Sequence, residues 1–116
     1  MKASSVVDAG ICGFTTFITA DAPDRRHVSF TITTPCEVVG RLVSALDDLQ
    51  PIDVYGEVDK RKDSLILAAV VETMAECRKS CAVPLGIFKA MQAATGLALA
   101  KDVHIEVVAD KADADS

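Results

Sequence analysis

The hydrophobic period of this chain changes at Thr34-Pro35, and that change restricts the possible folds more than any other feature. Before it, the segments 4–9, 14–19 and 27–33 are rich in β-branched and aromatic residues, and the last of them alternates strictly between apolar and polar. Alternation of this kind is typical of strands that are buried on one face. After it, apolar residues recur every three to four positions, which is typical of helices. The sequence therefore predicts strands first and helices after them.

Three helices are predicted, over residues 35–49, 64–77 and 84–96. Thr34 and Glu37 match a capping box at the start of the first helix, with Thr34 as the N-cap. The second helix is apolar all round in its first half, so we expect it to be buried on more than one side. A glycine follows the third helix at the position where helices commonly end.

The segment 103–107 alternates again and predicts a final strand that rejoins the sheet. The predicted fold class is therefore α+β, in the order β-β-β-α-α-α-β, with a mainly antiparallel sheet of about four strands covered on one face by helices. Residues 1–108 form a single domain, with 50–63 as a connecting loop that is partly helical. The acidic tail 109–116 has no large apolar residue and is expected to be disordered.

Composition excludes several classes of function. A chain of 116 residues has room for one core, and its net charge of −5 provides no overall positive field for nucleic acid. Its longest apolar run is far shorter than the roughly 18 residues of a membrane-spanning helix. The amino terminus has no signal-peptide pattern, so we expect a cytoplasmic protein.

Four cysteines carry the main functional signal, and each falls at an end of a predicted element. They are Cys12 at a strand corner, Cys36 in a helix first turn, Cys77 at a helix carboxyl end, and Cys81 before the last helix. In a reducing compartment such cysteines are free, metal-bound or reactive, whereas in a secreted chain they would form two disulfides. Backbone N–H groups at the helix starts would favour the thiolates of Cys36 and Cys81.

Four thiolates from three regions can close a tetrahedral zinc site or hold an iron–sulfur cluster. The spacing contains one near-pair, Cys77-x3-Cys81, and two distant cysteines, so it matches neither paired zinc knuckles nor the compact ferredoxin motif. Cys12, Cys36, Cys77 and Cys81 are the predicted metal ligands, with zinc or an iron–sulfur cluster as the cofactor. The expected role is electron transfer or metal handling.

Two other interpretations stay open. In one, the cysteines are inert core residues of an interaction or small-ligand-binding module, and a second copy of the chain covers the all-apolar helix. In the other, Cys36 is a reactive thiolate and another cysteine resolves its oxidised form, although no C-x-x-C motif is present. The partner classes that remain are a second copy of the chain and a protein redox partner.

Neither the histidines nor known motifs indicate catalysis. His27 and His104 fall on the polar phase of predicted strands, so we expect them to be exposed. The chain has no HExxH, no G-x-G-x-x-G, no phosphate-binding loop and no spacing typical of a Ser/His/Asp triad. No catalytic residue is predicted, and the chain is expected to be a binding protein rather than an enzyme.

Three segments carry a resemblance to a protein family. Cys12-Gly13-Phe14-Thr15-Thr16 and the C-x-x-P-x-G-I segment at 81–87, together with residues 96–103, resemble a small uncharacterised family of anaerobic bacteria and archaea. The resemblance implies a compact domain of unknown function with cysteines at the four positions above. It also implies an anaerobic host, in which an oxygen-sensitive cluster would survive, but it implies no reaction.

Overall fold

The computed structural model describes residues 1–110, which form a four-stranded antiparallel sheet and helices. The strands are β1 (Lys2–Asp8), β2 (Thr15–Asp21), β3 (His27–Thr33) and the short β4 (Ile52–Asp53), in the spatial order β1-β2-β3-β4. In register, Val6 pairs with Phe17, Ile18 with Ile32, and Val28 with Ile52. A 3-10 turn, η1 (Gly10–Cys12), joins β1 to β2.

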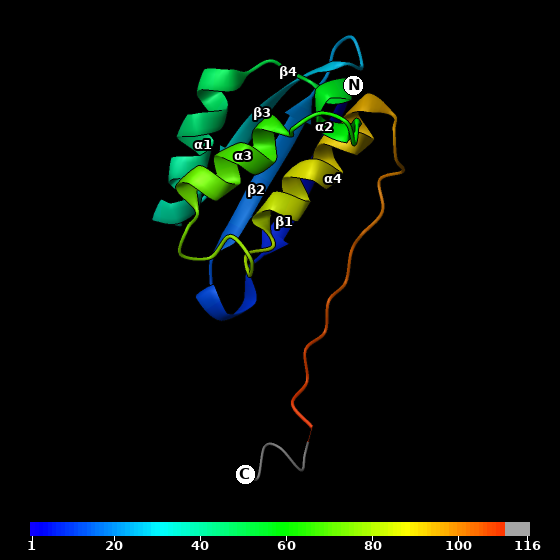
Figure 1. Ribbon diagram of the computed structural model, residues 1–116. Helices are drawn as coiled ribbons and strands as arrows, with labels where there is room; N and C mark the ends of the chain where they lie inside the picture. Colours follow the sequence, from blue (N-terminus) through cyan, green and yellow to red (C-terminus); the bar gives the residue numbers. More distant parts are fainter. Residues whose placement is uncertain (111–116) are drawn as a thin grey trace.

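The helices are α1 (Glu37–Leu49), α2 (Val54–Val58), α3 (Leu65–Thr73) and α4 (Val83–Thr95). They lie on one face of the sheet, with α4 over β1 and β2 and α1 beside α3 (Figure 1). The predicted α+β class, with helices covering one face, is therefore confirmed. No helix among residues 1–110 combines the length and the apolar character that a membrane span requires.

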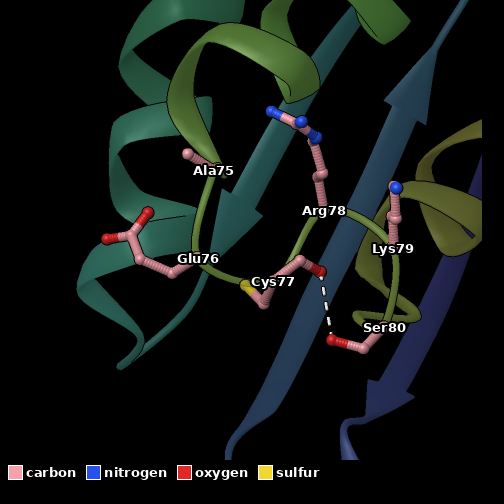
Figure 2. Close-up of a pocket in the computed structure, with 6 residues that line it drawn as sticks. All are labelled: Ala75, Glu76, Cys77, Arg78, Lys79 and Ser80. Atoms are coloured by element: carbon pink, nitrogen blue, oxygen red, sulfur yellow. Dashed lines mark hydrogen bonds between the residues drawn. The ribbon is translucent and has the colours of Figure 1, made fainter.

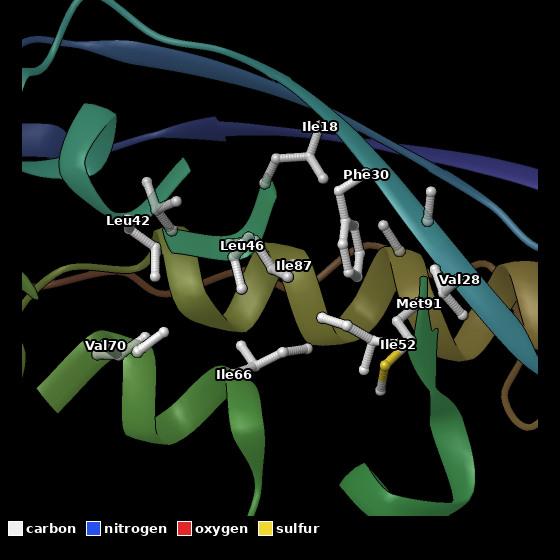
Figure 3. Close-up of a cluster of buried hydrophobic side chains, with 14 of the residues drawn as sticks. Ile18, Val28, Phe30, Leu42, Leu46, Ile52, Ile66, Val70, Ile87 and Met91 are labelled. Carbon is white, nitrogen blue, oxygen red and sulfur yellow. The ribbon is translucent and has the colours of Figure 1, made fainter. Parts of the chain in front are cut away.

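The core forms between the sheet and the helices, from the apolar phase of each element. Figure 3 shows side chains from β2, β3, β4 and all the longer helices meeting in one cluster. Its largest buried members include Ile18, Leu46, Ile66, Ile87 and Met91, each at most 1 % exposed. Burial of one such side chain contributes about 1.5–3 kcal/mol, so this cluster holds the helices against the sheet.

The carboxyl-terminal segment differs from the prediction. Residues 97–110 contain no helix or strand, so the predicted strand 103–107 is not formed, and its residues are exposed. The fourth strand is instead β4, which lies inside the segment 50–63 that we predicted to be a connecting loop; α2 is the helical part expected there. β4 occupies the edge of β3, and the outer edge of β1 is left without a partner strand among the described residues. Alternation identifies a segment able to form a strand, but it does not specify whether that segment pairs. Of the predicted tail 109–116, residues 111–116 lie outside the described part.

Helix boundaries differ from the prediction in two places. The first helix begins at Glu37 with Cys36 as its N-cap, so the predicted N-cap at Thr34 is wrong by two residues. The second helix has the predicted N-cap, Ser64, but ends at Thr73 instead of near Cys77. Met74 is fully buried, and the residues after it are small, polar or charged, so no continuous apolar face extends beyond it.

Candidate cysteine site

Cys12 lies on the turn that joins the first two strands. Gly10 and Gly13 both have positive φ, 71° and 74°, a conformation that side chains other than glycine rarely adopt. The Gly13 N–H donates to the Gly10 carbonyl at 2.9 Å, which closes the 3-10 turn. Cys12 is exposed on this turn, so its thiol faces solvent and is free to meet a ligand.

Cys36 lies where the third strand passes into α1. Its N–H donates to Thr34 Oγ1 at 3.2 Å, and its carbonyl accepts the N–H of Gly40 at 2.9 Å. Thr34 Oγ1 also lies 2.9 Å from Thr16 Oγ1, which ties this corner to β2. The Cys36 side chain makes no capping bond and is partly buried against the core. The Cys36 thiol is therefore positioned at the start of α1 without a hydrogen bond to the helix.

Cys77 and Cys81 lie on the loop between α3 and α4. The Cys77 carbonyl accepts the N–H groups of Ser80 and Cys81 at 3.0 and 2.9 Å, and the Ser80 hydroxyl at 3.3 Å. Figure 2 shows this turn, where residues 75–80 line a shallow hollow of about 260 Å³. Cys81 Sγ accepts the N–H of Val83, the first residue of α4, at 3.5 Å. Cys77 and Cys81 therefore lie at the two ends of one hydrogen-bonded turn.

An ion pair between elements anchors the start of this loop. Arg41 Nη2 of α1 lies 2.5 Å from Glu76 Oε2, and Arg41 Nε donates to the Thr73 carbonyl at 3.3 Å. The hydrogen bond from Arg41 lowers the pKa of Glu76, so this carboxylate stays ionised beside Cys77. The sequence places Arg41 on the polar face of its helix and gives no signal for this contact, because the partner is distant along the chain.

The four cysteines share one end of the molecule. η1, the start of α1 and the loop between α3 and α4 all lie at the lower end in Figure 1. Burial raises the pKa of the Cys77 thiol, and the negative charges of Cys81, Cys36 and Cys12 raise it further.

The thiols are gathered but not arranged as a ligand set. All four are free. Within residues 1–110, no group of three or more His, Cys, Asp or Glu side chains is placed to hold a metal ion. The ligation of a metal by Cys12, Cys36, Cys77 and Cys81 therefore stays a prediction. Cys36, Cys77 and Cys81 also pack against the core, as the inert interpretation expects.

The two histidines lie on the surface, as predicted. His27 Nδ1 is 2.6 Å from Asp24 Oδ2, and Asp24 Oδ1 also accepts the N–H groups of Arg26 and His27. The His27 side chain lowers the pKa of Asp24 most strongly, followed by these backbone donors. His104 lies on the carboxyl-terminal segment, 3.9 Å from Glu106. Asp24 and His27 thus stabilise the turn before β3.

Comparison with known proteins identifies a family and no activity. The model of a protein family of unknown function matches residues 3–107 of this chain. No curated protein matches the chain, and no solved structure matches it. The match covers all four cysteines and, apart from Lys2 at the start of β1, every described helix and strand.

Proposed function

Since the chain belongs to DUF6951, a family of unknown function, we propose from its own residues that it is a cysteine-ligated metal- or iron–sulfur-binding protein. The carrying observation is that four thiols come from three separate segments that lie at one end of the fold: η1, the start of α1 and the loop between α3 and α4 (Figure 1). Such a protein would work in the cytoplasm, in electron transfer or in metal handling.

The electrostatics of the cluster support a cation as its ligand. Thiolates brought together without a cation repel one another, and this repulsion contributes to the raised pKa of Cys77. A bound soft cation would reverse the effect, because each thiolate would then face a positive charge. Protons and metal compete for the same sulfur atoms, so apparent affinity would rise with pH and binding would release protons.

Ligation requires the thiols to move closer together. A tetrahedral zinc site has zinc–sulfur distances of about 2.3 Å. Cys12 is exposed between two glycines with positive φ, and Cys77 and Cys81 lie on a loop rather than in a helix. These segments can shift without disturbing the sheet, whereas Cys36 is fixed at the start of α1. An anaerobic host, which the resemblance of the chain implies, would favour an iron–sulfur cluster over zinc.

The test is metal content after anaerobic purification, followed by titration of the reduced chain with Zn²⁺ and with Co²⁺. We expect bound iron with sulfide-to-iron absorbance, or one zinc or cobalt ion per chain with thiolate-to-cobalt absorbance. Replacing any of the four cysteines by serine should weaken binding by about tenfold or more, since each supplies a thiolate. His104→Ala is the matched control, because it removes a potential ligand outside the cluster. A chain that takes up neither metal and shows four freely titrating thiols would disprove the proposal.

A second candidate function is an interaction module in which the cysteines are core. It is favoured by α3, which buries Ile66 and Val70 but leaves Leu65, Leu67 and Val71 about half exposed. A partner that covered these side chains would bury an apolar face that is costly to leave in water. Leu67→Lys should then abolish that association, whereas replacement of Cys12 and Cys36 by alanine should leave it unchanged. Metal bound through those same cysteines would instead identify the first function.

A further inference from the structure

The sheet has an open edge at β1. Among residues 1–110, β1 pairs with β2 alone, and its other side carries no strand. The strand is seven residues long, contains no proline and pairs with β2 without interruption over its whole length. A long, regular edge of this kind is a ready template for another strand, and proteins normally cover or disrupt it.

A groove follows this edge. It has a volume of about 830 Å³ and lies between β1, α4 and the carboxyl-terminal segment. Ser4 and Val6 of β1 and Leu85, Lys89 and Ala93 of α4 are among the residues that line it. Ser5 and Val7 face α4, and on that side Leu85 is 41 % exposed and Ala93 also lines the groove, so the groove offers apolar surface beside unpaired backbone. Those are the two features that a strand with alternating side chains recognises.

The carboxyl-terminal segment has the properties of such a strand. We call residues 97–110 the arm. Within it, Val103, Ile105 and Val107 form an apolar phase and are 51 %, 68 % and 90 % exposed. His104 and Glu106 form the polar phase and face each other at 3.9 Å. Three large apolar side chains at strand spacing, all in water, indicate a surface that is incomplete in the single chain.

The arm belongs to the family's domain and projects from its body. The family match extends to Val107, so the apolar phase of the arm lies inside the matched region and the acidic end lies outside it. Figure 1 shows the arm leaving the end of α4 and running clear of the sheet, and the molecule measures 54 × 29 × 28 Å. Residues 99–105 flank the groove beside their own β1 without pairing with it.

From these observations we propose that two copies of the chain exchange arms, residues 103–107 of each adding as a strand to the β1 edge of the other. In such a dimer with two-fold symmetry, each β1 edge gains a partner strand and each arm buries its apolar side chains. The apolar phase would face α4 and the groove, and the polar phase would face solvent. The proposal does not depend on the function of the cysteines, which lie on other segments.

The test uses the full chain and two matched variants at neighbouring positions. Ile105→Asp places a charge on the apolar phase, and His104→Asp places the same charge on the polar phase. We expect light scattering to show a dimer for the unaltered chain and for His104→Asp, and a monomer for Ile105→Asp. Hydrogen exchange should show the alternate β1 amides that face away from β2 slowed by about tenfold or more in the dimer.

The same measurements contain the results that would overturn the proposal. A chain that is monomeric at all concentrations, with fast exchange at these amides, has no exchanged arm. Slow exchange that does not depend on concentration would mean that each arm pairs with its own β1. A dimer that persists in Ile105→Asp would use another surface, such as α3. Unchanged β2 exchange in every variant shows that the variants are folded, so each result bears on the arm.

Discussion

Gly86 shows how one residue sets the distance between a helix and the sheet. A Cβ atom added there would overlap Val7 Cγ2 and lie 3.2 Å from Ile18 Cδ1. The Gly86 carbonyl accepts the Ser5 hydroxyl at 2.9 Å, which holds α4 against β1. Alanine favours a helix by about 1 kcal/mol, but here it would force two buried side chains to move. We expect Gly86→Ala to lower the free energy of unfolding by about 1–3 kcal/mol, measured by urea denaturation.

Gly40 is the control for this prediction. It lies inside α1, and a Cβ added there would meet nothing within 4 Å. The same substitution should therefore raise the free energy of unfolding, by up to about 1 kcal/mol, through helix propensity alone. If Gly40→Ala and Gly86→Ala change the free energy of unfolding equally, the packing of α4 on the sheet does not determine the sign of that change.

At the scale of elements, α2 supplies the cap of α3. The Glu57 carboxylate accepts the Ser64 hydroxyl at 2.6 Å and the N–H groups of Leu65 and Ile66, both at 2.9 Å. These donors belong to the start of a helix, where a negative charge is also favoured by the helix dipole. We expect Glu57→Ala to lower the free energy of unfolding by about 1–2 kcal/mol in thermal or urea denaturation.

The matched substitution for this cap is Glu72→Ala. Glu72 is exposed and lies in the last turn of α3, where a negative charge is not favoured. Its removal should leave stability unchanged or raise it slightly. If Glu72→Ala lowers the free energy of unfolding as much as Glu57→Ala, the effect of Glu57 does not come from its position at the start of α3.

For the molecule as a whole, we expect the free energy of unfolding to fall at alkaline pH because of the cysteines at one end of the fold. The folded-state pKa of Cys77 is raised by burial and by thiolates on three other positions of the chain, so the folded state holds this proton more tightly than the unfolded state. The resulting stabilisation is complete below the unfolded pKa of about 8.5. It is lost as pH rises from there through the folded pKa.

The measurement is urea denaturation of the reduced, metal-free chain between neutral pH and pH about 10.5, a range that brackets the ordinary thiol pKa. Cys77→Ala should flatten the alkaline fall in stability relative to the unaltered chain. His104→Ala should leave that fall as it is, since His104 is exposed on the arm. If Cys77→Ala does not change the alkaline fall in the free energy of unfolding, the Cys77 thiol does not cause that fall.

Local sequence patterns are enough to assign strands and helices wherever a segment buries one face. Strict alternation in 27–33 and the apolar stripe of α1 require burial of a single face, and Ser64 and Gly96 mark helix ends through local bonding. Local patterns also placed each cysteine at or near an end of an element, because those ends depend on local residues. These properties depend on neighbours in the chain.

Contacts between residues that are distant along the chain become known from the folded structure alone. β4 fills the edge of β3, while 103–107 has the pattern of a strand but does not pair with the free edge of β1 in its own chain. Arg41 meets Glu76, and Glu57 caps α3, through contacts that no local pattern encodes. The gathering of four thiols at one end follows from the antiparallel path of strands and helices. Local periodicity specifies which face is buried, but only packing specifies what lies against it.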